Sequence, residues 1–232
     1  MSKLMDCQGV INLATKLIDK NPGNLHSPDN YLLHLEDTYK ICKEIVETAI
    51  SSYPELSNYL KEEEVALAGG LHDIGRPLQE NQLFHELRGA QYIEQYGLKI
   101  GVAESEVDIY RIAQMFRPHY VVAEQFADPD NSDQLNGITT LPDSALLIPR
   151  TWQEAIVIYS ELSNVNGNRM SVEERIDDVK DRYTNDPKFN SNPAFINAMK
   201  TGLDRVFEVC DRVQKLIDGD FEPEEIMRYG FL

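Results

Sequence analysis

Apolar residues recur at every third or fourth position along most of the chain, a spacing that predicts amphipathic helices. The first helix is expected over about residues 3–19, and Asn21-Pro22-Gly23 ends it. The second begins after Ser27, a capping residue followed by Pro28, and runs to about Ser52. On this second helix the core stripe consists of Leu35, Thr38, Cys42, Ile45 and Ala49, with His34 on its edge.

Two later segments lack a polar face, which predicts that both lie buried near the centre of the fold. One is Val65 to Leu71, and the other is the middle of a helix expected over Thr151 to Leu162. Gly69 and Gly70 lower the helix propensity of the first segment. We therefore expect another helix to approach closely at these two glycines.

Two more helices are predicted between these buried segments. One covers Leu83 to Tyr96 and is closed by Gly97, and the next covers Glu104 to Phe116 and is stopped by Pro118. The stretch from Ala127 to Pro149 is rich in Asp, Asn, Gly and Pro and is too long for a plain connection. It is expected to be either a lid near a site or a mobile surface loop.

The C-terminal part completes an all-α pattern. Ser171 opens a helix with a capping box, and a long amphipathic helix is expected over Ser191 to Ile217. No run of alternating strand residues and no internal repeat occurs. We predict a single-domain helical bundle with an N-terminal helix packed on the core (1–24), a main body (25–185) and a helical extension of the same domain (186–232). Pairing of the long helix with a second chain, and hence a homo-oligomer, stays open.

The formal net charge is −17, from 39 acidic and 22 basic side chains. Such a surface repels DNA, RNA and anionic lipid, so we expect neither a nucleic-acid polymer nor a membrane as partner. A phosphate substrate would need a local positive centre, such as a metal or a few arginines. Cys7, Cys42 and Cys210 lack zinc-type spacing and fit buried thiols of a reducing compartment. Because Met1 to Lys20 also lack a long apolar run, we predict a cytoplasmic protein.

Four of the five histidines lie at the ends of predicted elements or on core edges: His34, His72, His85 and His119. Asp73 follows His72 at the end of a buried helix, where an unpaired polar side chain would cost several kcal/mol. Imidazole and carboxylate together suit Zn, Mn, Fe, Co or Ni. Neighbouring helical residues point about 100° apart. His72 and Asp73 can therefore serve one metal through a bridging carboxylate, or two metals that share Asp73.

The order of these residues resembles the HD superfamily of metal-dependent phosphohydrolases. That all-α family has a lone His, a His-Asp pair, often further histidines and a final Asp. The matching segments span about residues 25–185 and are Tyr31-Leu32-Leu33-His34, His72-Asp73-Ile74-Gly75-Arg76-Pro77, His85-Glu86-Leu87-Arg88-Gly89-Ala90 and His119. Where the family has a Tyr-Ala-Asp context for its last ligand, this chain has Tyr159-Ser160-Glu161-Leu162. Glu161, one methylene longer than Asp, is therefore the candidate ligand there.

The resemblance implies hydrolysis of phosphate mono- or diesters by a metal-activated water, with small nucleotide-like substrates favoured by the acidic surface. One or two divalent ions (Mn, Fe, Co, Ni, Zn or Mg) would be held by His34, His72, Asp73, His85, His119 and Glu161. Asp73 would also take part in catalysis, and Arg76 and Arg88 would clamp the phosphate.

Two other functions stay open from the sequence. Some members of the superfamily are di-iron oxygenases with a similar ligand set, and Glu161 at the last ligand position is also compatible with a non-catalytic regulatory module. Each residue has a structural explanation too: a hydrogen-bonded core histidine for His34, surface histidines for His85 and His119, a satisfied acid for Glu161, and ordinary surface cations for Arg76 and Arg88.

Overall fold

The computed structural model describes residues 3–80, 83–135, 137–165, 168–185, 193–222 and 225–226, and it confirms the predicted all-α class. Its α-helices are α1 (Cys7–Lys20), α2 (Pro28–Ser52), α3 (Glu62–Leu71), α4 (His85–Ile100), α5 (Glu106–Phe116), α6 (Val122–Ala127), α7 (Trp152–Leu162), α8 (Val172–Asn185) and α9 (Pro193–Asp218). Short 3₁₀ turns are η1 (Pro54–Asn58), η2 (Arg76–Leu78), η3 (Pro129–Leu135) and η4 (Ser144–Leu147). The two-residue strands β1 (Asn164–Val165) and β2 (Asn168–Arg169) pair antiparallel.

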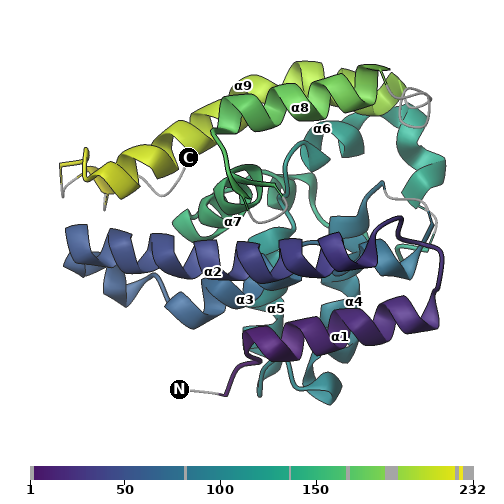
Figure 1. Ribbon diagram of the computed structural model, residues 1–232, viewed down its shortest axis with the longest axis horizontal. Coiled ribbons are helices and arrows are strands. Elements are labelled where there is room, and N and C mark those ends of the chain that lie inside the picture. The colour runs from purple at the N-terminus through teal and green to yellow at the C-terminus, as the bar shows by residue number, and fades with distance from the viewer. Residues whose placement is uncertain are drawn as a thin grey trace.

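Helix α7 lies in the middle of the bundle (Figure 1). It packs against α2, α3 and α5 on one side and against α8 and α9 on the other. Helix α1 covers the outer side of α2 and α3. Within the described ranges, no helix is long and apolar enough to cross a bilayer.

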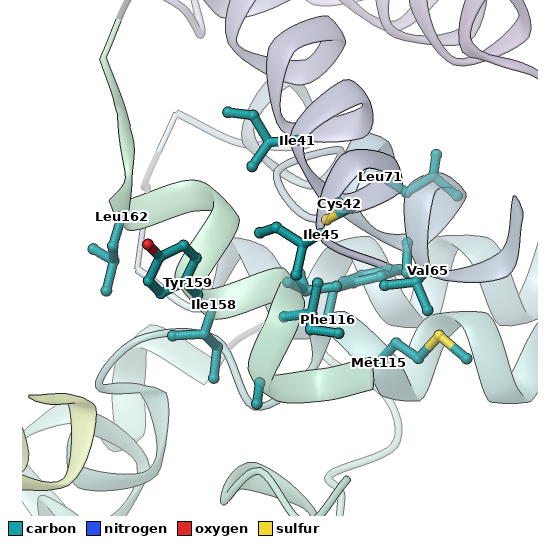
Figure 2. Close-up of a cluster of buried hydrophobic side chains, with 14 of the residues drawn as sticks. Ile41, Cys42, Ile45, Val65, Leu71, Met115, Phe116, Ile158, Tyr159 and Leu162 are labelled. Atoms are coloured by element: carbon teal, nitrogen blue, oxygen red, sulfur yellow. The ribbon is translucent and has the colours of Figure 1, made fainter. Parts of the chain in front are cut away.

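The apolar side chains of α7 explain its central position. Ile158, Tyr159 and Leu162 of α7 belong to a buried apolar cluster shared with the surrounding helices (Figure 2). The other labelled members are Ile41, Cys42 and Ile45 of α2, Val65 and Leu71 of α3, and Met115 and Phe116 of α5, all buried. The all-apolar patterns of α3 and α7 thus have the expected cause, which is burial on every side.

The expected close approach at Gly69 and Gly70 is confirmed. A Cβ on Gly69 would lie 3.2 Å from the Thr38 carbonyl oxygen of α2 and closer still to the sulfur of Cys42. A Cβ on Gly70 would lie 3.0 Å from the Tyr39 ring. The two glycines let α3 pack tightly on α2, which brings the residues after α3 close to the α2 residue His34.

Several predicted boundaries are wrong. Helix α1 begins at Cys7 rather than near residue 3, because the Asp6 side chain accepts a capping hydrogen bond from the Gly9 amide. Ser27 precedes α2 but its side chain makes no capping hydrogen bond. Gly97 does not close α4, since it packs on Ile109 of α5 and the helix continues to a left-handed residue, Gly101.

The stretch from Ala127 to Pro149 begins where α6 ends. It contains the short turns η3 and η4 among irregular segments. The capping box at Ser171 is confirmed, because the Ser171 hydroxyl accepts from the Glu174 amide and the Glu174 carboxylate accepts from the Ser171 amide. Ser191, the expected start of the last helix, lies outside the described residues.

Gly75 lies where the turn after α3 meets the start of α4. Its φ of −78° is an ordinary right-handed value, so the glycine is not needed for backbone conformation. A Cβ there would lie 2.7 Å from the Gly89 amide nitrogen and closer still to the His85 carbonyl oxygen. Both neighbours are backbone atoms and cannot move aside, so the contact requires glycine.

We expect Gly75→Ala to lower the free energy of unfolding by about 3 kcal/mol, because the backbone contact with α4 would have to open. Denaturant unfolding followed by circular dichroism measures this change. Gly101→Ala is the control: its φ of 75° carries backbone strain, but no atom lies within 4 Å of the added carbon. It should cost only about 1–2 kcal/mol. Equal losses in the two variants would contradict the packing explanation.

Candidate metal centre

The six predicted ligands come from five elements and converge at one place. His34 lies on α2, and His72 and Asp73 directly follow α3. His85 is the first residue of α4, and His119 follows α5. Glu161 lies in the last turn of α7. The convergence depends on the packing of α3 on α2 and of the turn at Gly75 on α4.

These side chains form two groups that could each hold a metal ion. In the first group, ligand atoms of His34, His72 and Glu161 lie within 4.8 Å of one another. In the second, the same holds for Asp73, His85 and His119. All six residues are predicted ligands, and Asp73 is the one that two ions are expected to share.

Asp73 connects the two groups. Its Oδ1 lies 2.7 Å from His85 Nε2 in the second group. Its Oδ2 lies 3.6 Å from His72 Nε2 and 3.9 Å from His34 Nε2 in the first. One carboxylate therefore faces ring nitrogens of both groups, as expected for a ligand shared by two ions.

The hydrogen bonds of His72 define which nitrogen faces the site. Its Nδ1 lies 2.6 Å from the Gly69 carbonyl oxygen, to which it donates. In a neutral imidazole the other nitrogen, Nε2, then carries a lone pair, and Nε2 lies 3.1 Å from His34 Nε2. Donation of the second ring N–H to a backbone carbonyl is the usual arrangement of a metal-ligating histidine.

Burial keeps His34 and His72 neutral. Desolvation lowers the pKa of His34 to about 4 and also lowers the pKa of His72. Neither ring then needs to lose a proton at neutral pH before it binds a metal.

His119 and Glu161 form an ion pair instead. Desolvation opposes charge on both, but their mutual attraction is stronger, so the pKa of His119 is raised to about 9 and that of Glu161 is lowered to about 2. His119 Nδ1 and Glu161 Oε2 lie 3.2 Å apart. Desolvation likewise opposes the charge of Asp73, but Arg76, His72 and His85 hold the pKa of this carboxyl well below its ordinary value.

Several buried ligand atoms lack a well-oriented hydrogen bond. Among the described residues, no partner in hydrogen-bonding geometry is found for Asp73 Oδ1, His119 Nδ1 or Glu161 Oε2, although charged groups lie near all three. Such atoms are costly in a protein interior. Four histidines and two carboxylates meet here, and imidazole with carboxylate is a set of ligands that could hold a metal ion.

The backbone is strained on both sides of the second group. The non-glycine residues with positive φ in the described ranges are Phe84 (57°) and Tyr120 (43°). Phe84 directly precedes His85, and Tyr120 directly follows His119. A left-handed conformation costs a bulky residue of order 1 kcal/mol or more and persists where the surroundings enforce it.

The two predicted phosphate clamps differ in their surroundings. Arg76 Nε donates to Asp73 Oδ2 at 2.5 Å, and the side chain is 28% exposed. Arg76 therefore lies at the site and meets solvent. Arg88 is buried one turn beyond His85 and donates to the Leu83 carbonyl oxygen, which ties down the segment before α4.

Three residues around the centre were missed from the sequence. Glu86 is buried, with Oε2 3.2 Å from His85 Nδ1. The Tyr31 hydroxyl donates to the Asp73 carbonyl oxygen at 3.0 Å. Arg205 of α9 donates to the Tyr120 carbonyl oxygen at 2.8 Å and binds both carboxylate oxygens of Glu124. Tyr31 could have been found from its place one turn before His34, whereas Arg205 carries no local signal.

The centre is not completely shielded from solvent. The His34 side chain is 16% exposed and that of His85 is 11% exposed, whereas His72 is fully buried. His34, His85 and Arg76 are therefore members of the centre that solvent reaches.

Comparison with family models, curated proteins and solved structures gave no significant match. The interpretation of the centre therefore depends on its own geometry.

We predict that metal binding at pH 7 releases about one proton per chain. His119 is protonated in the metal-free protein because its pKa is about 9, and it must become neutral to act as a ligand. Affinity should rise about tenfold per pH unit between pH 7 and pH 9 and level off above. Calorimetry with Mn²⁺ or Zn²⁺ in buffers of different ionisation enthalpy counts the protons. Binding without proton release at pH 7 would contradict a ligand role for His119.

Proposed function

We propose that the protein is a metal-dependent hydrolase of small phosphate mono- or diesters. The observation that carries the proposal is Asp73, a buried carboxylate whose two oxygens face two separate groups of ligand atoms. A centre with one shared carboxylate is suited to two ions, and two-metal sites are typical of enzymes that cleave phosphate esters.

The neighbours of each histidine would determine which ring nitrogen carries the proton and which one binds the ion. His34, His72 and Glu161 would hold one ion, and His85 and His119 would hold the other, with Asp73 between them. The Gly69 carbonyl keeps the His72 proton on Nδ1. Glu86 lies beside Nδ1 of His85 and can accept a hydrogen bond from a proton on that nitrogen. The other nitrogen, Nε2, faces Asp73 and would then be the ligand atom.

The ions would lower the pKa of a coordinated water toward neutrality and neutralise charge on the phosphoryl oxygens. Arg76 would assist from the solvent side. Its charge lies beside Asp73 and it is partly exposed, so an incoming phosphate meets a cation at the mouth of the site. Burial of His72 and Asp73 keeps the surroundings low in dielectric, which strengthens these interactions.

The acidic surface supports small substrates rather than polymers. With a net charge of −17, the protein repels a polyanion along its length, whereas a single phosphate group can be bound by a local cationic centre. Nucleotide-like esters are consistent with this restriction.

Hydrolysis can be tested with purified protein, a panel of phosphate esters, and Mn²⁺, Co²⁺, Ni²⁺, Fe²⁺, Zn²⁺ or Mg²⁺ in turn. We expect metal-dependent phosphate release that falls at least about 100-fold in His72→Ala and Asp73→Asn. His26→Ala is the matched control, because His26 is exposed in the loop before α2 and should be dispensable.

Two results would contradict the proposal. One is the absence of turnover of every ester with every metal. The other is an iron-loaded protein that consumes oxygen and releases no phosphate, which would indicate oxygenase chemistry in the same centre.

A further inference from the structure

The segment that carries His119 is attached to helix α9. Helices α6 and α9 pack together (Figure 1). A Cβ on Gly202 of α9 would lie 2.7 Å from the Glu124 carboxyl carbon and 2.9 Å from the Val121 side chain. Arg205 follows three residues later and therefore shares this face of α9. The close approach at Gly202 thus brings Arg205 to the connection between α5 and α6.

Arg205 makes two kinds of contact with this connection. Its Nε and Nη2 donate to the two carboxylate oxygens of Glu124 at 2.9 and 2.8 Å. Nη2 also donates to the Tyr120 carbonyl oxygen at 2.8 Å. The Arg205 side chain is only 17% exposed, and a planar guanidinium bound at both ends of its fork has a fixed orientation. Arg205 therefore holds the carbonyl that lies one residue after His119.

The residue whose carbonyl Arg205 binds is strained. Tyr120 has a φ of 43°, and the other non-glycine residue with positive φ in the described ranges is Phe84. Tyr120 follows His119 and Phe84 precedes His85, so both adjoin ligands of the second group. Neither adjoins a ligand of the first group. Strain of this kind persists only where the surroundings enforce it.

Relaxation of Tyr120 would move His119. A change from a left-handed to a right-handed conformation alters φ and ψ together and turns the peptide units on both sides of the residue. One of these units carries the carbonyl bound by Arg205, and the other joins Tyr120 to His119. The hydrogen bond from Arg205 therefore opposes a movement that would displace the His119 ring, whose Nδ1 lies 3.2 Å from Glu161 Oε2.

We propose that Arg205 is a positioning residue for the second ion, which it stabilises by keeping Tyr120 left-handed and His119 at the centre. The effect on metal binding rests on the proposed two-ion function of the centre. Helix α9 contributes no candidate ligand, so it would control the affinity of the second ion without touching that ion. Binding of the first ion should not depend on Arg205.

A titration with Zn²⁺ alone tests the selectivity of this effect. The full-length protein is labelled with ¹⁵N at its five histidines, and the ring signals are followed. His34 and His72 report the first ion, His85 and His119 report the second, and the exposed His26 is an internal control. We expect Arg205→Met to weaken binding of the second ion by at least about tenfold and to leave the first unchanged.

Arg111→Met is the matched control. Arg111 of α5 donates to both carboxylate oxygens of Glu64 of α3 at 2.8 and 2.7 Å, so its loss also removes a two-pronged ion pair between helices. Both ions should bind to this variant as they do to the parent. Arg205→Lys keeps the charge beside Glu124 but not the planar fork. It should weaken the second ion less than Arg205→Met does, and again leave the first unchanged.

The metal-free proteins provide a second readout. His119 faces Glu161 in the parent. The His119 ring signals should therefore shift in Arg205→Met before any Zn²⁺ is added, and those of Arg111→Met should not. Unchanged His119 signals in Arg205→Met, equal weakening of both ions, or the same loss in Arg111→Met would each overturn the proposal.

These outcomes are separable from those that test the hydrolase. If the histidine signals of the parent do not respond to Zn²⁺, the metal centre is contradicted, and the His119 signals of the metal-free variants still decide whether Arg205 positions this ring. Selective loss of the second ion in a protein that turns over no ester would overturn the hydrolase and leave the role of Arg205 intact.

Discussion

The structure depends on one buried negative charge, the carboxylate of Asp73. It lies where the turn after α3 meets α2 and α4, and it is 2% exposed. An isolated carboxylate would not stay ionised there, yet Arg76, His72 and His85 hold its pKa well below the ordinary value. Removing one of these partners would leave charge buried without compensation. The glycines that bring the helices together at this point therefore serve the site as well as the core.

Parts of the chain that are distant in sequence hold the ligands around Asp73 in place. His119 is held at the site between α5 and α6, and α9 supports this segment through Arg205, which binds the strained Tyr120 carbonyl and Glu124. On the other side of the centre, the β1–β2 hairpin follows Glu161 and contacts α2 through the ion pair of Arg169 with Glu44. The ligand-bearing helices thus enclose a buried cluster of histidines and carboxylates within a protein whose formal net charge is −17.

The sequence predicted the features that depend on local pattern. The helical spacing gave the bundle, and the order of His34, His72-Asp73, His85 and His119 predicted which side chains meet. Gly97 was misread because a glycine that closes a helix and one that packs on Ile109 look alike in sequence. The role of Arg205 could not be predicted, since its contacts with Tyr120 and Glu124 join residues more than 80 positions apart and depend on how the helices dock.

We propose that six side chains form a centre for two metal ions: His34, His72, Asp73, His85, His119 and Glu161. Diffraction data collected at the absorption edge of the metal carried by the purified protein test it most directly. We predict two anomalous peaks, one among His34, His72 and Glu161 and one among Asp73, His85 and His119. Crystals of folded, metal-supplemented protein with no anomalous peak in either group would contradict the account.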